Sequence, residues 1–249
     1  MTWFDLKRLP EQEVMDSEEE VEAYASAAAQ AYLESIDRSF VDHVQRLLAP
    51  ADGGRMARSA LDFGCGPGQI PIMMARRWPS MQIIGLDASP RMVAQAREAA
   101  AQAGVSASFA VFRLGPDEVG ERRLPYPDGA FDVVTCNSVL HHLADPLGTL
   151  DELARVAKPG GVVLVRDLRR PSTLAYPLHV RLFGRHYSGE MRRLFEASVR
   201  AAYTVAELQS LLAISRLGDG RARVFQRGLT HVGIERAALP GLGLSGNGH

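Results

Sequence analysis

The feature that most constrains this chain is a loop with glycine at every second position, which directly follows a short apolar stretch. The stretch covers residues 61–63, and the glycines are Gly64, Gly66 and Gly68. Glycine has no Cβ atom, so it can adopt positive φ angles and let the backbone lie against a bound ligand. A helical pattern begins at Gln69, so the loop is predicted to join a buried strand to a helix beside a ligand site.

The rest of the chain places this loop in a regular alternation of strands and helices. Most of the strands are runs of Val, Ile and Leu, which is typical of strands covered by helices on both faces. Strands separated by helices pair in parallel through right-handed crossovers, so we predict an α/β fold. The predicted strands cover residues 60–63, 82–86, 106–112, 131–136 and 162–167, and the helices cover 69–78, 90–103 and 146–157.

The segments on either side of this alternation are predicted to serve the substrate. The N-terminal part is acidic over residues 11–22 and helical over 24–48, and we expect a packing helix that also forms a lid over the glycine loop. An arginine-rich insertion follows the fifth strand and should rise at the same end of the sheet. The predicted division is an N-terminal helical cap over 1–58, a domain over 59–239 with a substrate-side insertion over 169–203, and a disordered tail over 240–249.

Composition limits the partners and the compartment. The 249 residues carry a net charge of −1, which gives no global attraction to nucleic acid or to an anionic membrane. The chain has only two cysteines and no apolar run long enough to span a bilayer. We therefore expect a cytoplasmic protein, monomeric or homodimeric, that acts on a small molecule. Its preference for arginine over lysine suggests a bacterial source.

An acidic residue beyond the loop narrows the ligand. Asp87 ends the second predicted strand, about twenty residues after the first, where a carboxylate can accept hydrogen bonds from ribose hydroxyls. A dinucleotide and S-adenosylmethionine both fit this position. The dinucleotide pattern has its third glycine three residues after the second, where this chain has Gln69. The spacing therefore favours S-adenosylmethionine.

Five motifs together resemble the class I S-adenosylmethionine-dependent methyltransferases, within the type 11 group that includes ubiquinone and menaquinone C-methyltransferases. The resemblance implies a Rossmann-like doubly wound sheet of seven strands, mostly parallel with a reversed last strand, that binds S-adenosylmethionine across strands one, two and four. S-adenosylhomocysteine would be the product. The motifs cover residues 62–68, 85–92, 124–134, 140–143 and 158–161.

The resemblance also implies which residues hold the cofactor. The glycines would approach its amino-acid part, Asp62 would bond its ammonium group through water, and Asp87 would hold the ribose. Relatives commonly have Gly-Asp after the third strand, but this chain has Arg113-Leu114 there, so the adenine contact would come from Arg113 or from Asp117. The predicted cofactor-binding set is Asp62, Gly64, Cys65, Gly66, Gly68, Asp87, Ala88, Met92, Arg113, Leu114, Asn137 and His142.

The predicted reaction is methyl transfer to a small-molecule acceptor by in-line displacement. Orientation alone can supply roughly 7–11 kcal/mol of such a barrier, and a base is needed only if the acceptor must lose a proton. His142 and His141 are the catalytic candidates, with a structural role as the alternative. Tyr24, His179 and Tyr187 are candidates for substrate binding.

Other functions fit parts of the sequence. No cluster of histidine, cysteine and carboxylate has metal-ligand spacing, so no catalytic metal is expected. The alternatives are a non-catalytic S-adenosylmethionine sensor or partner protein, a nucleic-acid methyltransferase that uses the arginine-rich insertion, and an NAD-dependent oxidoreductase, which the glycine spacing disfavours.

Overall fold

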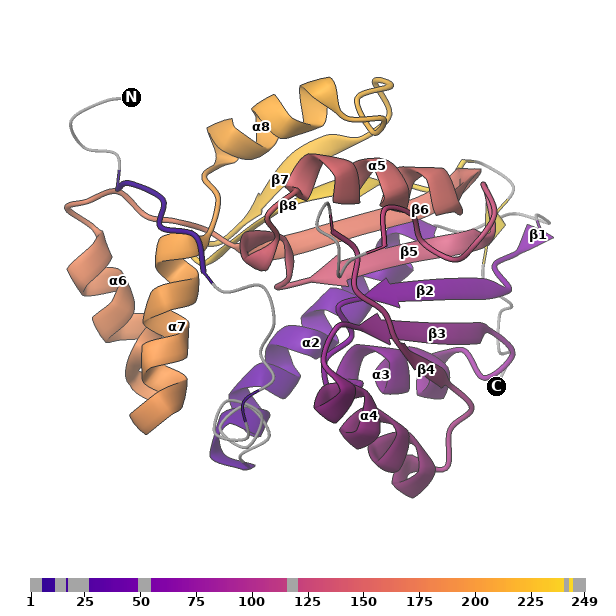
Figure 1. Ribbon diagram of the computed structural model, residues 1–249, viewed down its shortest axis with the longest axis horizontal. Coiled ribbons are helices and arrows are strands. Elements are labelled where there is room, and N and C mark those ends of the chain that lie inside the picture. The colour runs from indigo at the N-terminus through magenta and orange to yellow at the C-terminus, as the bar shows by residue number, and fades with distance from the viewer. Residues whose placement is uncertain are drawn as a thin grey trace.

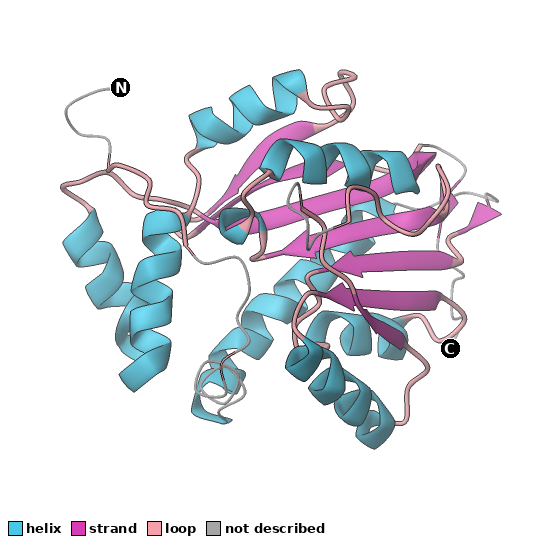
Figure 2. Cartoon of the chain, in the orientation of Figure 1, coloured by secondary structure: helices cyan, strands magenta, loops and turns pink. Residues whose placement is uncertain are grey.

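A twisted seven-stranded sheet lies at the centre of the structure, with helices on both faces (Figures 1 and 2). The computed structural model describes residues 6–11, 17, 27–48, 55–115, 121–239 and 242–243. The strands stand in the order β4-β3-β2-β5-β6-β8-β7. Their bounds are β2 (Ser59–Phe63), β3 (Gln82–Asp87), β4 (Ser108–Val111), β5 (Phe131–Asn137), β6 (Ala157–Leu168), β7 (Arg223–Arg227) and β8 (His231–Arg236).

The direction of the strands confirms the predicted topology. Strands β2 to β6 pair in parallel, whereas β8 runs antiparallel to both β6 and β7. The last strand of the sheet in sequence order is therefore the reversed one. Strand β2 lies between β3 and β5, so the strand order reverses at the strand that leads into the glycine loop. Ligands of open α/β sheets bind at such a reversal.

The two faces of the sheet bury different helices. On one face, α2 (Ala27–Leu48) and α3 (Gln69–Arg77) pack over Val133 and Leu164, with α4 (Pro90–Ala103) beside them. On the other face, α5 (Pro146–Val156) and α8 (Val205–Ile214) pack over strand residues such as Val134 and Val165. Successive side chains of a strand point to opposite faces, which explains why neighbouring valines belong to different clusters.

Capping residues mark the start or the end of two helices at the positions that the sequence predicts. The Ser89 side chain accepts a hydrogen bond from the backbone N–H of Met92 at the start of α4, and Gly104 ends that helix with φ +64°. Thr204 and Glu207 form the reciprocal capping box at the start of α8. These caps satisfy N–H groups that have no partner within the helix.

The insertion after β6 is largely helical. It forms α6 (Tyr176–Phe183), a 3-10 turn η2 (Gly184–His186) and α7 (Gly189–Ala201), which stand at the end of the sheet toward which β2, β3 and β5 point (Figure 1). Several of its arginines pair locally, as Arg192 does with Glu196 at 2.9 Å. The position of α6 and α7 confirms that the insertion rises at the end of the sheet where the glycine loop lies.

Two segments near the chain ends are held by backbone pairing. The N–H of Leu9 donates to the carbonyl of Arg200 at 3.1 Å, which fixes residues 6–11 against the end of α7. Strand β1 (Arg55–Met56) pairs in parallel with β9 (Leu242–Gly243). Part of the segment predicted as a disordered tail is therefore a paired strand, while 240–241 and 244–249 lie outside the described residues. No helix in the described part of the chain combines the length and apolarity needed to cross a membrane.

We expect helix α8 to hold its face of the sheet mainly through Leu208, whose side chain is fully buried. The substitution Leu208→Ala should lower the free energy of unfolding by about 2–5 kcal/mol, because it removes buried apolar contacts and leaves a cavity. Ile214→Ala, on the same helix but 68% exposed, should change it by less than about 0.5 kcal/mol. Urea unfolding of both variants measures the difference, and equal losses would contradict this account of the core.

Candidate functional site

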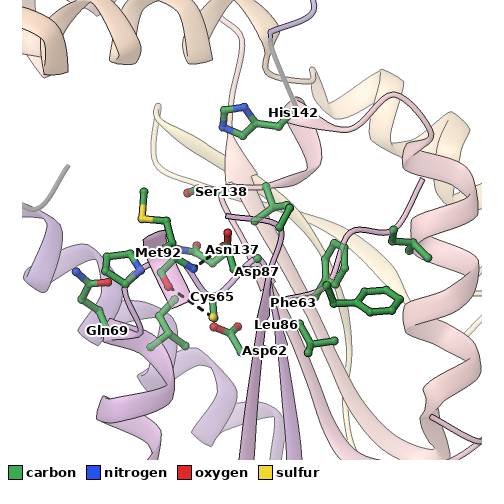
Figure 3. Close-up of a pocket in the computed structure, with 18 of the residues that line it drawn as sticks. Asp62, Phe63, Cys65, Gln69, Leu86, Asp87, Met92, Asn137, Ser138 and His142 are labelled. Carbon is green, nitrogen blue, oxygen red and sulfur yellow. Dashed lines mark hydrogen bonds between the residues drawn. The ribbon is translucent and has the colours of Figure 1, made fainter. Parts of the chain in front are cut away.

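An open pocket of about 1000 Å³, called the donor pocket below, lies at the carboxyl ends of β2, β3 and β5. Its wall includes the glycine loop, the end of β3 and the residues that follow β5. Figure 3 shows Asp62, Cys65 and Asp87 near the loop, with His142 at the opposite end of the pocket. The position agrees with the ligand site predicted from the order of the strands.

The three glycines of the loop have different roles. All have positive φ, between +52° and +88°. Gly66 lines the donor pocket, and a Cβ added there would meet no protein atom within 4 Å, so the backbone is open to a ligand. A Cβ on Gly68 would lie 2.9 Å from that of Ala96, because Gly68 caps α3 and packs against α4. Gly68 is not among the residues that line the pocket and acts on the loop through packing, so its predicted contact with the cofactor stays a prediction.

Asp87 connects the glycine loop to the end of β3. One carboxylate oxygen accepts a hydrogen bond from the backbone N–H of Gly66 at 2.8 Å, and the other accepts from the N–H of Ser89 at 2.9 Å. These bonds fix the carboxylate at the rim of the donor pocket, which it lines. The residue predicted to hold ribose hydroxyls is therefore positioned by the loop itself.

Asp62 is a buried carboxyl group under the glycine loop. It is 2% exposed, and its Oδ1 lies 2.7 Å from the hydroxyl of Thr135 on β5. Burial raises its pKa to about 7, while the bond from Thr135 opposes the rise and the charges of Asp37 and Asp87 add to it. A cationic group in the donor pocket would favour the ionised form.

The end of β5 is held by a buried arginine. Arg166 on β6 is 1% exposed, and its Nε donates to Asn137 Oδ1 at 2.8 Å. Oδ1 accepts this bond, and the amide nitrogen of Asn137 can donate to a ligand. The next residue, Ser138, has φ +58°, which is uncommon for a residue with a Cβ atom. Both residues line the donor pocket.

The two predicted catalytic histidines have different surroundings. His141 is buried, and its ring Nδ1 lies 2.6 Å from Asp167 Oδ1, while its backbone N–H donates to Asp167 Oδ2. Burial opposes the charged form of His141, but Asp167 outweighs this effect and raises the pKa of His141. His142 lines the donor pocket, whereas His141 does not. His141 lines the neighbouring pocket instead, and His142 is the histidine of the two that borders the donor pocket.

Residue Glu11 lies close to both histidines. Its Oε2 is 3.8 Å from His141 Nε2 and 3.9 Å from His142 Nδ1. The three side chains each have one atom that could bind a metal ion, and these atoms lie within 4.8 Å of one another. The cluster joins the N-terminal segment to the 3-10 turn η1 (Leu140–His142). The expected absence of a catalytic metal rested on sequence spacing and stays a prediction.

Asp37 also lines the donor pocket, although the sequence did not predict it as a site residue. It lies on α2 and is 8% exposed, among the buried positions Phe40, Val41 and Val44. Burial raises its pKa to about 6, although Arg166 opposes the rise. Its spacing in the sequence was the available signal. Asp37 precedes the apolar residues Phe40 and Val44 by three and seven positions, so it lies on the same face of the helix, which is the face that packs inward.

The structure brings most of the other predicted residues together. Cys65, Ala88, Met92, Arg113 and Leu114 line the donor pocket, as does Phe112, which was not predicted. His179 packs against Phe183, with ring centroids 4.8 Å apart, and lines neither this pocket nor the neighbouring one. Tyr24 and Asp117 lie outside the described residues.

A second pocket of about 840 Å³, called the side pocket below, adjoins the donor pocket. It lies between α2, α7 and the ends of β5 and β8, and the predicted residue Tyr187 lines it. The two pockets share four residues, which are Asp37, Asn137, Ser138 and His142. A ligand in one pocket can therefore meet a ligand in the other across these four side chains.

Comparisons with known proteins agree with this arrangement. Residues 61–165 match the family profile described as a methyltransferase domain. An uncharacterized methyltransferase of Schizosaccharomyces pombe is 37% identical over 121 residues, which are 47% of this chain and 42% of that protein. A demethylmenaquinone methyltransferase of Deinococcus radiodurans is 32% identical over 165 residues, which are 66% of this chain and 65% of that protein.

A solved SAM-dependent methyltransferase of Aquifex aeolicus has the same fold. It superposes with a TM-score of 0.59 at 18% identity and covers 90% of this chain and 100% of its own. The chain spans about half the length of the curated relatives that it matches. These findings confirm the predicted resemblance, and the matched residues include the glycine loop, Asp87 and both histidines.

We expect Asp62 to lower the stability of the ligand-free protein at neutral pH. Its folded pKa of about 7 exceeds the usual value of 3.8, so the unfolding free energy should fall as pH rises from about 4 to 7. Asp62→Asn removes this loss and should raise the unfolding free energy at pH 8 by up to about 4 kcal/mol, given about 1.4 kcal/mol per pKa unit over about three units. Urea unfolding at pH 8 and pH 5 tests this, and a gain that is not larger at pH 8 would refute the assignment.

Proposed function

We propose that this chain, which carries a methyltransferase domain of the S-adenosylmethionine-dependent class, transfers the methyl group of that cofactor to a small-molecule acceptor by in-line displacement. The observation that carries the proposal is the junction of the two pockets. The donor pocket contains the residues of the family motifs, and the side pocket opens onto it at Asp37, Asn137, Ser138 and His142. Donor and acceptor can thus be held on either side of one set of side chains.

The residues of the donor pocket fit S-adenosylmethionine. Asp87, fixed at the end of β3, would accept hydrogen bonds from the ribose hydroxyls. Gly66 leaves space for the amino-acid part, and the buried carboxyl of Asp62 would favour its ammonium group. Met92 and Phe112 supply apolar surface for the adenine ring. Arg113 also lines the pocket, which supports it as the adenine contact in place of the usual acid.

The bound cofactor supplies a methyl group that its sulfonium already activates, so the protein has mainly to orient the acceptor and exclude water. His142, which faces both pockets, would accept a proton from an acceptor that must lose one. His141 would position the turn η1, because Asp167 binds both its backbone N–H and its ring.

A small molecule is the acceptor class that the surroundings support. The relatives include a demethylmenaquinone methyltransferase, whose name indicates a quinone precursor as its substrate. In the insertion, Arg192 and Arg193 are paired with Glu196 and Glu190, which reduces their attraction for nucleic acid. We therefore keep a small-molecule acceptor as the proposal, and a non-catalytic cofactor sensor as the alternative that an activity screen would reveal.

The first test is cofactor binding. Calorimetry should detect binding of S-adenosylmethionine and S-adenosylhomocysteine but not of NAD. Asp87→Ala should weaken S-adenosylhomocysteine binding by about 1.5–3 kcal/mol, because hydrogen bonds to a charged group are lost and the loop loses its anchor. Glu98→Ala, an exposed acid on α4, serves as the control and should leave the affinity unchanged. An Asp87→Ala protein with wild-type affinity would show that the ribose lies elsewhere.

The second test separates catalysis from cofactor binding. A labelled-methyl screen over phenols, amines, thiols and quinone precursors identifies an acceptor. With that acceptor, His142→Ala should lower kcat about a hundredfold or more, the lower end of general-base contributions, while S-adenosylhomocysteine affinity stays within about twofold of wild type. Parallel losses of turnover and affinity would assign His142 to cofactor binding. An absence of any methylated product, with intact binding, would support the sensor.

A further inference from the structure

The side pocket has an apolar wall built from parts of the chain that are distant in sequence. Tyr32, Leu33 and Ile36 come from α2, while Leu194 and Phe195 come from α7. The helices of the insertion, which the family motifs do not reach, thus face the N-terminal helix across a shared space. Pockets lined mainly by apolar and aromatic side chains are typical of sites for small organic ligands.

Aromatic rings dominate one side of this wall. The rings of Tyr187 and Phe195 lie with centroids 5.2 Å apart, and Tyr32 meets Tyr187 edge-on at 6.1 Å. Phe183 at the end of α6 also lines the pocket. Such rings offer flat apolar surfaces that pack against other rings in offset or edge-to-face arrangements. The shape and chemistry of the wall favour a planar ligand.

The charges around the side pocket disfavour an anion. None of the described residues that line it is Lys or Arg, and Asp37 is the only carboxylate among them. Arg166 lies nearby, but it is 1% exposed and its Nη1 and Nη2 donate to the carbonyl of Ile36. Burial, reinforced by Arg166, lowers the pKa of His231 to about 3, so this lining residue is neutral. His141 also lines the side pocket, but its ring is paired with Asp167, so an anionic ligand would be repelled by Asp37 without gaining an unpaired cationic partner.

Four polar residues, Asp37, Asn137, Ser138 and His142, lie where the side pocket meets the donor pocket, while others, such as His141, Ser198 and Thr230, line the side pocket alone. Asp37 presents a carboxylate there, and Asn137 presents its amide nitrogen, while Arg166 donates to the amide oxygen. Both groups border the donor pocket as well. A hydroxyl group bound between them would donate to Asp37, accept from Asn137 and keep one lone pair for the methyl group. An amino group would donate to Asp37 and keep its single lone pair. In both cases the nucleophilic atom would then face the donor pocket.

We propose that the side pocket binds the methyl acceptor, and that this acceptor is a planar, mainly apolar molecule without an anionic group, whose hydroxyl or amino group lies between Asp37 and Asn137. The inference rests on the proposed methyl transfer and adds the chemical class of the acceptor. Aromatic and polycyclic alcohols or amines belong to this class. Nucleotides, sugar phosphates and carboxylic acids do not.

A matched pair of probes tests the class directly. Binding of 2-naphthol and of 2-naphthyl phosphate is measured by naphthyl fluorescence and by calorimetry, with the protein saturated with S-adenosylhomocysteine. We expect 2-naphthol to bind at least tenfold more tightly than the phosphate, which has the same rings. Equal or reversed affinities, or no binding of 2-naphthol, would overturn the proposal.

Substitutions locate the probe. Ser198→Phe should fill the side pocket and weaken 2-naphthol binding at least tenfold, whereas Ala197→Phe, at the exposed neighbouring position, should not. Asp37→Asn should weaken 2-naphthol binding about tenfold, because it removes a charge-assisted hydrogen bond.

Cofactor binding distinguishes the possible failures. S-adenosylhomocysteine binding by Ser198→Phe and Asp37→Asn shows that these variants are folded. If the wild type binds S-adenosylhomocysteine but Ser198→Phe leaves 2-naphthol binding intact, the side pocket is not the acceptor site, while the proposed methyl donor stands. If Asp37→Asn weakens S-adenosylhomocysteine binding instead, Asp37 serves the donor, and its assignment to the acceptor is wrong. If the wild type fails to bind S-adenosylhomocysteine, the proposed function itself fails.

Discussion

The buried guanidinium of Arg166 is the interaction on which both pockets depend. It donates to the carbonyl of Ile36 and to the hydroxyl of Ser39 on α2, to Asn137 at the end of β5, and lies over the ring of Phe40. A buried charge costs several kcal/mol unless its donors are satisfied, so these partners hold helix and sheet together. The same bonds orient Asn137 and place Asp37 at the junction of the pockets.

The buried acids of this site differ in how their charge is compensated. Asp167 is paired with His141, which outweighs burial and lowers the pKa of Asp167. For Asp62 and Asp37, burial dominates and raises the pKa to about 7 and about 6. Acids that a fold leaves under-compensated weaken the free protein, and they mark places where a cationic or hydrogen-bonding ligand completes the structure. Both line the donor pocket.

Predictions from the sequence located residues of the donor pocket where those residues lie close together in the chain. Short motifs contain the glycine loop, Asp87 and the residues after β5. Two of the three glycines, Gly64 and Gly66, line the donor pocket, and Gly68 does not. The predictions failed where the fold joins distant segments. Asp37 faces the site from a helix, His179 turns away from both pockets, and Phe112 takes a place for which no motif indicated an aromatic residue.

The sequence by itself determined the alternation of strands and helices, the position of the glycine loop and the class of the methyl donor, because a bound cofactor at parallel strand ends requires particular residues at fixed local spacing. Only the tertiary structure decided the side pocket. Its wall combines α2 with the insertion helices, and its polar end combines Asp37 with Asn137. Their proximity depends on how Arg166 docks α2 onto the sheet, and a contact between residues about a hundred positions apart leaves no periodic signal in a single sequence.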